Sequence, residues 1–177
     1  MPAPSNATSV CPGCGLDLPE TDGRAHPYIG ASPACWARYG ELLARDYGVY
    51  GMPDEHKFVV DAYAVQHPGE DGREARQSVT VHLIRLCLML ERERGTEYST
   101  RLMSRATNGV ATFPWLDPVT PLGSMTVLDV LAAEDRDAHI AASRAWAEDQ
   151  WAAWGDKHVL VRSWCDALEA QLPYETF

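Results

Sequence analysis

Apolar residues recur at helical spacing through most of the chain after residue 32. In the segment 73–94, the apolar positions Val79, Leu83, Leu86 and Leu90 are separated by three or four residues, which places them on one face of a helix. The same reasoning predicts helices over residues 32–46, 53–66, 96–106, a helix opening at 126, and 135–172 with a break near 155–156. The pattern therefore predicts a mainly α fold.

Capping signals indicate where several of these helices begin. Ser32 followed by Pro33 matches an N-cap residue and a first helical residue. Thr126 followed three positions later by Asp129 matches a capping box. These signals locate the starts of the predicted helices more precisely than their ends.

The chain divides into a short tail, a small metal-binding element and a helical part. Residues 1–9 are small and polar and predict a flexible tail. Residues 10–177 are expected to form a single domain, with 10–35 as a metal-binding element of turns and short strands and 36–177 as a compact helical domain. In the Pro/Gly-rich loop 107–125, we expect Phe113, Trp115 and Leu116 to fold back onto the core.

The segment Cys11-Pro-Gly-Cys-Gly has the form of a zinc knuckle. Two cysteines separated by two residues can direct both sulfurs at one ion, and thiolate is a donor that zinc accepts in tetrahedral geometry. Pro12 presets the turn, and we expect Gly13 to tolerate positive φ and Gly15 to let the backbone curl back. A redox pair of the thioredoxin type needs a preceding core strand and a following helix, and this sequence predicts neither.

Cys35 is the natural third ligand, because it lies in the first turn of the helix that follows Ser32. The dipole at a helix N-terminus stabilises a thiolate there. A knuckle, a hairpin and a cysteine at a helix start resemble the layout of treble-clef zinc modules. Those modules usually take a fourth ligand one helical turn later, where this chain has Arg38.

The fourth ligand is expected to be a histidine. His26 ranks first, since it completes a local set of Cys-x2-Cys-x11-His-x8-Cys without a long-range contact. His67, at a helix end before Pro68, and His82, on the apolar stripe of the third helix, are the alternatives.

His67, His82 and Asp61 also form a second possible constellation. They lie on two successive predicted helices, and they would converge if these helices pack together. The imidazoles would then act as ligands or as general acid and base, oriented by Asp61 or Gln66. The alternative interpretation is that His82 is a core residue and that Asp61 and Gln66 are surface or capping residues.

Other conspicuous residues are interpreted as core. Cys87 and Cys165 lie within apolar helical patterns, where cysteine behaves as a small hydrophobic residue. Four tryptophans recur in the last helical segment, and core packing is favoured there over an apolar ligand pocket; they are Trp146, Trp151, Trp154 and Trp164.

Composition and charge limit the classes of function that the chain could have. The 177 residues are 46% apolar, which is ordinary for a globular protein, and carry a net charge of −10, which disfavours nucleic acid as a partner. No signal peptide or membrane helix is predicted, and five clustered cysteines favour metal binding over disulfides. We therefore expect a cytoplasmic protein.

The chain resembles an uncharacterised bacterial family, a domain of unknown function with an N-terminal Cys-Pro-Gly-Cys-Gly zinc knuckle. The resemblance covers about residues 10–165 and implies no activity, but it places the named histidines within the family's own pattern. It is carried by the stretches Cys11–Pro19, His26–Ser32, Cys35–Ala37, Asp61–Pro68 and His82–Leu86.

Taken together, the sequence predicts a Zn²⁺ protein in which the metal is structural and the helical domain binds a protein or a small molecule. The alternative is a zinc-dependent hydrolase or thiol-type transferase with an open zinc position, in which His67, His82 or Asp61 supplies acid–base chemistry. Neither substrate nor oligomeric state is predicted.

Overall fold

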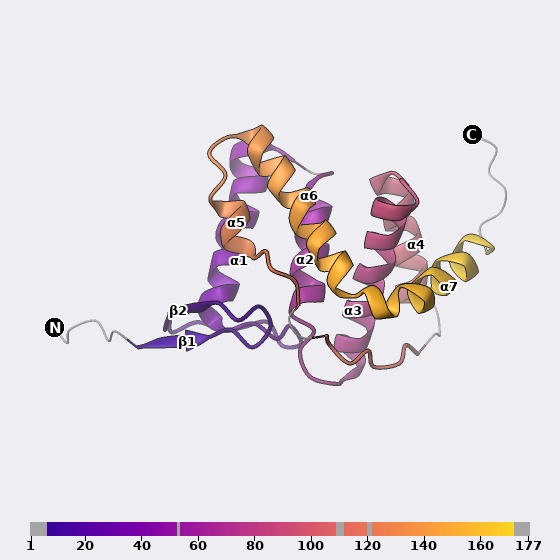
Figure 1. Cartoon of the computed structure of the whole chain (residues 1–177), viewed down its shortest axis with the longest axis horizontal. Coiled ribbons are helices and arrows are strands. Elements are labelled where there is room, and N and C mark those ends of the chain that lie inside the picture. Colours follow the sequence, from indigo (N-terminus) through magenta and orange to yellow (C-terminus); the bar gives the residue numbers. More distant parts are fainter. Residues whose placement is uncertain (1–6, 53, 109–111, 120–121, 172–177) are drawn as a thin grey trace.

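A computed structural model describes residues 7–52, 54–108, 112–119 and 122–171, and Figure 1 shows a mainly helical molecule with one small hairpin. The hairpin pairs β1 and β2 antiparallel, with Ser9 opposite Leu18. In chain order the elements are β1 (Thr8–Val10), β2 (Asp17–Pro19), α1 (Pro33–Arg45), η1 (Asp46–Tyr50), α2 (His56–Gln66), α3 (Arg73–Leu86), η2 (Cys87–Glu91), α4 (Thr96–Asn108), α5 (Val127–Leu131), α6 (Arg136–Ala153), η3 (Gly155–Lys157) and α7 (His158–Glu169).

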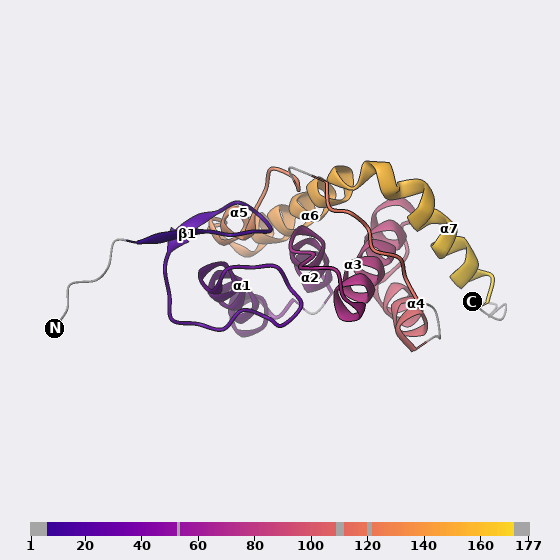
Figure 2. The ribbon, with the colours of Figure 1, turned by 90° about the horizontal axis from the view of Figure 1, so that it is seen from below.

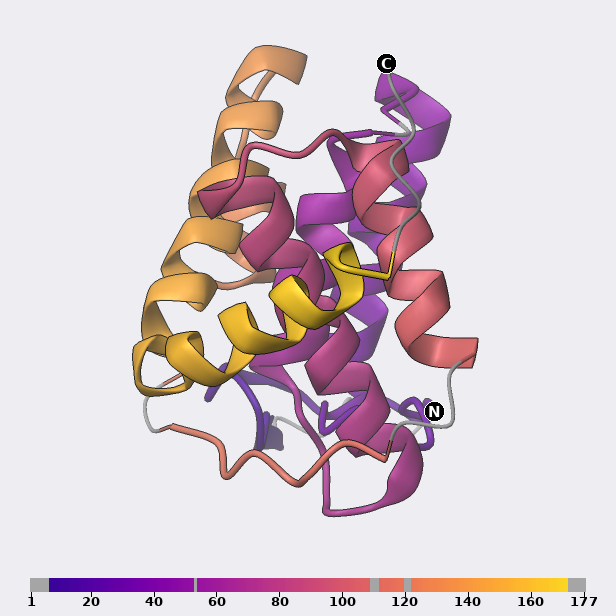
Figure 3. The same cartoon turned by 90° about the vertical axis from the view of Figure 1, so that its right-hand side faces the viewer.

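The helices form two layers. Figure 2 shows α1, α2, α3 and α4 side by side in chain order, with α5, α6 and α7 lying along one side of that row. Helix α2 packs against both α3 and α6, and α5 packs against α1. In Figure 3, α7 crosses over α3 towards α4, and both pairs are in contact. Helix α2 is therefore central, and its end is well placed to anchor a site.

The core lies between the two layers and includes the residues that the apolar patterns indicated. Trp146, Trp154, Cys87 and Cys165 are fully buried. The loop 112–119 returns to this core, since Leu116 is buried and the ring of Phe113 lies 5.6 Å from that of Trp164. The predictions of a tryptophan-rich core and of buried cysteines are confirmed.

The predicted caps are also confirmed. The Ser32 side chain accepts a hydrogen bond from the Cys35 amide, and Thr126 and Asp129 form the reciprocal capping box of α5. No helix in the described part of the chain is long and apolar enough to cross a membrane.

Two helix ends and the N-terminal tail differ from the prediction. Helices α1 and α3 continue into the π-helical turns η1 and η2, which a continuous apolar stripe does not distinguish from α-helix. Thr8 and Ser9, assigned to the tail, belong to β1, because pairing with β2 satisfies their backbone groups. Residues 1–6 of the predicted tail lie outside the described residues.

Candidate metal centre

The turn between β1 and β2 carries the first two cysteines. The Cys11 amide donates to the Leu16 carbonyl at 2.8 Å, and the Gly15 amide donates to the Cys11 carbonyl at 2.9 Å. Gly15 has a φ of +74°, a conformation that glycine adopts at low cost. These bonds close the turn tightly enough to bring Cys11 and Cys14 to the same side.

Gly13 is needed for a different reason from the expected positive φ, which the structure does not show there. A Cβ atom on Gly13 would lie 2.4 Å from Cδ2 of His67, 2.7 Å from the Gln66 carbonyl oxygen and 2.9 Å from the Gly30 carbonyl oxygen. The absence of a side chain therefore allows the turn to lie directly against the end of α2.

Cys35 is positioned by the first turn of α1. Its amide donates to the Ser32 hydroxyl at 3.2 Å, and its buried sulfur accepts a hydrogen bond from the Tyr63 hydroxyl at 3.5 Å. The Ser32 amide donates to the Cys11 sulfur at 3.5 Å. Such donors stabilise negative charge on sulfur and fix its position.

His67 completes the group from the end of α2. Its Nδ1 lies 2.8 Å from the Tyr63 carbonyl oxygen. Because a carbonyl can only accept, Nδ1 carries a proton, which leaves Nε2 as the nitrogen that can bind a metal once it is deprotonated. That Nε2 lies 3.4 Å from the Cys35 sulfur. The ring is therefore held in the tautomer that a metal ligand requires.

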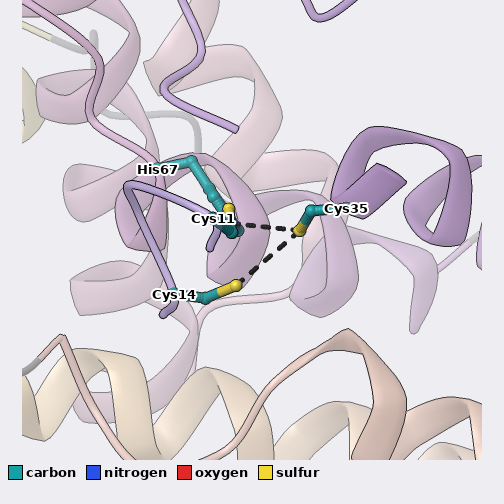
Figure 4. A group of neighbouring side chains, drawn as sticks. All are labelled: Cys11, Cys14, Cys35 and His67. Carbon is teal, nitrogen blue, oxygen red and sulfur yellow. Dashed lines mark hydrogen bonds between the residues drawn. The ribbon is translucent and has the colours of Figure 1, made fainter. Parts of the chain in front are cut away.

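The four side chains converge from three separate segments, as Figure 4 shows. One ligand atom from each of Cys11, Cys14, Cys35 and His67 lies within 4.8 Å of all the others, and the Cys14 and Cys35 sulfurs are 3.7 Å apart. All are buried except the partly buried Cys14. This Cys3His group can hold a metal ion.

The thiols strongly alter one another's affinity for protons. Hydrogen bonds with Cys14 and Cys35 hold the pKa of Cys11 far below its ordinary value, whereas hydrogen bonds with Cys11 and Cys14 raise the pKa of Cys35. Burial lowers the pKa of His67, but Cys11 and Cys14 outweigh it and raise that pKa to about 9. Cys11 thus ionises easily while Cys35 resists ionisation beside it, and a bound cation would offset this repulsion between neighbouring thiolates.

The structure places the candidate histidines differently from what the local spacing favoured. His67, ranked below His26, lies with the three thiols, whereas the His26 ring packs edge-on to Tyr28 at 4.3 Å and lies 5.2 Å from Trp36. The local spacing misled because the segment after β2 packs His26 against Trp36 of α1 instead of against the sulfurs. Arg38, at the fourth-ligand position of a treble clef, pairs with Glu41 on the surface.

Asp61, His82 and Arg85 form a hydrogen-bonded cluster apart from the candidate metal centre. The buried Asp61 carboxylate accepts two hydrogen bonds from Nε of Arg85 and one from its Nη2, all between 2.6 and 2.9 Å. The same carboxylate lies 2.6 Å from Nδ1 of His82. Gln66 donates instead to the Leu122 and Met125 carbonyls. The predicted convergence of His67 with His82 does not occur, and Asp61 and Gln66 are buried rather than at the surface.

A third buried polar group was not found from the sequence. Asp46 is fully buried in η1, and its two oxygens lie 2.7 Å from Nδ1 of His56 and 2.6 Å from Nε2 of His139. Nothing in the spacing of these residues marks them as neighbours, because His139 comes from α6, 93 positions further along the chain.

The fold and this site define a mainly helical protein with a buried Cys3His group that joins its N-terminal hairpin to the helices. Residues 9–155 match the model of the family of unknown function DUF5946, and the chain belongs to this family. No curated protein and no solved structure matches the chain.

Proposed function

We propose that the protein binds one Zn²⁺ ion through Cys11, Cys14, Cys35 and His67, and that this ion is structural. The observation that carries the proposal is the convergence of four ligand atoms within 4.8 Å. The ion would hold the hairpin and the start of α1 against the end of α2, so that the helical domain can bind its partner. The reduced thiols suit a cytoplasmic location.

The spacing of the ligand atoms supports zinc. In a tetrahedral zinc site with bonds of about 2.3 Å to sulfur and about 2.0–2.1 Å to nitrogen, two sulfurs lie about 3.8 Å apart and a sulfur and a nitrogen about 3.6 Å apart. The corresponding separations here are 3.7 Å between Cys14 and Cys35 and 3.4 Å between Cys35 and His67. These two pairs are therefore already spaced nearly as they would be around the ion.

A structural role is supported over a catalytic one. The chain supplies four donors, and a structural zinc site uses four protein ligands whereas a catalytic site leaves one position open. His82 and Asp61, the candidate acid–base residues, are engaged with each other and with Arg85 rather than directed at the thiols.

The fourth ligand is tested by comparing two histidine variants. We expect His67→Ala to lower zinc affinity by more than the roughly 10- to 100-fold that follows loss of a group that only hydrogen-bonds to a metal ligand. The matched control, His26→Ala, should keep one zinc per chain, because His26 lies outside the group. Zinc content is measured by elemental analysis, and the ligands by zinc-edge X-ray absorption.

The spectrum of the unaltered protein should fit three sulfurs and one nitrogen. Loss of zinc from His26→Ala with retention in His67→Ala would contradict the assignment, as would an oxygen ligand in the unaltered protein. Cys14→Ser provides a second check and should also release the ion.

A further inference from the structure

The four residues of the candidate metal centre are not equally protected from solvent. Three of them are at most 1% exposed, whereas Cys14 is partly exposed. Cys14 also lies between Gly13 and Gly15, and neither neighbour carries a side chain that could cover it. Cys14 is therefore the member of the group that a small molecule from solvent meets first.

The three sulfurs also differ in the donors around them. The Ser32 amide donates to the Cys11 sulfur at 3.5 Å. The Tyr63 hydroxyl donates to the Cys35 sulfur at the same distance. Within the described residues, no amide or hydroxyl donates to the Cys14 sulfur, which contacts the Cys35 sulfur. Because hydrogen bonds draw negative charge from a sulfur, Cys14 keeps the most nucleophilic one.

A second thiol lies next to Cys14. Its sulfur is 3.7 Å from that of Cys35, and Figure 4 shows the two sulfurs directed at each other, one from the knuckle and one from α1. A disulfide bond is about 2.05 Å long, so the two sulfurs need to approach by roughly 1.7 Å. An accessible cysteine with a second thiol beside it has two features of a redox-sensitive pair.

We propose that Cys14 is a site of oxidation by hydroperoxides, and that Cys35 then forms a disulfide with it and so releases the metal ion. This inference rests on the proposed zinc site, because a bound ion keeps both sulfurs as thiolates. It adds to the structural ion a condition under which the chain gives it up.

The oxidation takes two steps. The Cys14 sulfur attacks one peroxide oxygen; an S–O bond forms, the O–O bond breaks, and hydroxide leaves when the oxidant is hydrogen peroxide. The Cys35 sulfur then attacks the Cys14 sulfur; an S–S bond forms, the S–O bond breaks, and a second hydroxide leaves. The two thiolates together lose two electrons, and the peroxide is reduced to two hydroxide ions, which take up protons from water.

The disulfide removes two of the four ligands from the ion. Cys11 and His67 remain, and a closed zinc site needs four protein ligands, so the ion leaves. The knuckle stays joined to the start of α1 through the disulfide, but the link from both of them to the end of α2 is lost. Reduction of the disulfide in the presence of zinc restores that link.

The test adds excess hydrogen peroxide to the full zinc-loaded chain and follows zinc release with a colorimetric chelator. We expect about one zinc to be released per peroxide consumed, because one peroxide makes one disulfide. Reduction with a phosphine and addition of zinc should restore the original zinc content. Release of zinc without formation of a disulfide overturns the proposal.

Peptide mass spectrometry identifies the pair of cysteines. Free thiols are blocked with iodoacetamide in denaturant, and trypsin then cuts after Arg24, which separates Cys11 and Cys14 from Cys35. The expected disulfide joins the two peptides and leaves Cys11 alkylated. A disulfide between Cys11 and either of the other two cysteines overturns the assignment.

The two core cysteines provide a control. Cys87 and Cys165 are fully buried, and both should be recovered as alkylated thiols after peroxide treatment. The double variant Cys87→Ala, Cys165→Ala keeps only the three cysteines of the site, and it should lose zinc in peroxide as the unaltered chain does. Retention of zinc by a folded double variant would place the decisive oxidation elsewhere and overturn the proposal.

Zinc analysis before oxidation separates this inference from the proposed function. A purified chain without zinc overturns the proposed function and, with it, the oxidation proposal. A chain that holds one zinc through three sulfurs and one nitrogen, and that keeps this ion in excess hydrogen peroxide, overturns the oxidation proposal alone.

Discussion

At the scale of single residues, the candidate metal centre depends on Gly13, a position where a side chain would not fit. The turn carrying Cys11 and Cys14 reaches the end of α2 at Gly13, where His67 and two backbone carbonyls occupy the space that a Cβ would need. The knuckle motif therefore encodes two properties at once, the direction of the sulfurs and the closeness of the approach to the fourth ligand.

Replacing Gly13 with alanine should disturb this approach. We expect Gly13→Ala to reduce the free energy of unfolding by about 1–3 kcal/mol, the usual effect of overpacking, and to weaken metal binding because the His67 ring must move. Chemical denaturation measures the free energy of unfolding, and zinc titration measures the affinity for the metal.

Gly40 offers a matched control. It is exposed in the middle of α1, and a Cβ there would meet nothing within 4 Å. Gly40→Ala should stabilise the protein by about 0.5–1 kcal/mol, because alanine favours the helix. If both variants changed stability alike, the close approach at Gly13 would have no energetic importance.

At the scale of elements, α2 is fixed to α3 by charge as well as by apolar packing. Asp61 on α2 is fully buried, and its carboxylate is hydrogen-bonded to Arg85 and His82 on α3. A buried pair of this kind is not necessarily stabilising relative to apolar residues, but removing one partner leaves a buried charge uncompensated. The pair therefore fixes how the two helices meet.

The variant Asp61→Asn tests this role. It should destabilise the fold by about 3–5 kcal/mol, because Arg85 would remain buried without its counter-charge. Asp71→Asn removes the partner of Arg76 in an exposed pair and should leave stability nearly unchanged, because solvent screens such a pair. Thermal or denaturant unfolding compares the stabilities of the two variants. Equal losses of stability would contradict the role of Asp61 in fixing α2 to α3.

The helices themselves could be predicted from the sequence more fully than the contacts between them. Ser32 and Thr126 marked helix starts because capping is a local interaction that a short sequence window contains. The π-helical ends η1 and η2 were missed, since residues such as Leu83 and Leu86 follow the same spacing before either kind of turn. Three cysteines of the site were identified from local spacing, whereas His67 was ranked below His26 because only tertiary packing brings the end of α2 to the knuckle.

At the scale of the whole molecule, the Cys3His group lies where the N-terminal hairpin meets the helices. The hairpin is only three residues long in each strand, and a two-stranded hairpin is marginally stable by itself. The helices, in contrast, bury a continuous core from α1 to α7. Metal removal should therefore affect the two parts unequally.

Hydrogen exchange measured by mass spectrometry checks this expectation. With a chelator and a reductant at neutral pH, β1, β2 and the first turn of α1 should exchange much faster, while α3 and α6 keep their protection. Adding zinc back should restore the original pattern. A uniform loss of protection would mean that the ion stabilises the helical core as well, and no change would mean that it stabilises neither part.

The separation of the ligands along the chain also gives assembly a direction. Cys11, Cys14 and Cys35 leave the ribosome before His67, which follows Cys35 by 32 positions. On the proposed zinc site, an ion captured early by the nascent chain would have only three protein ligands, with its fourth position open to water or to competing thiols. That position closes only after α2 has formed and met the knuckle, so a fully coordinated ion reports that the first two-fifths of the chain has folded.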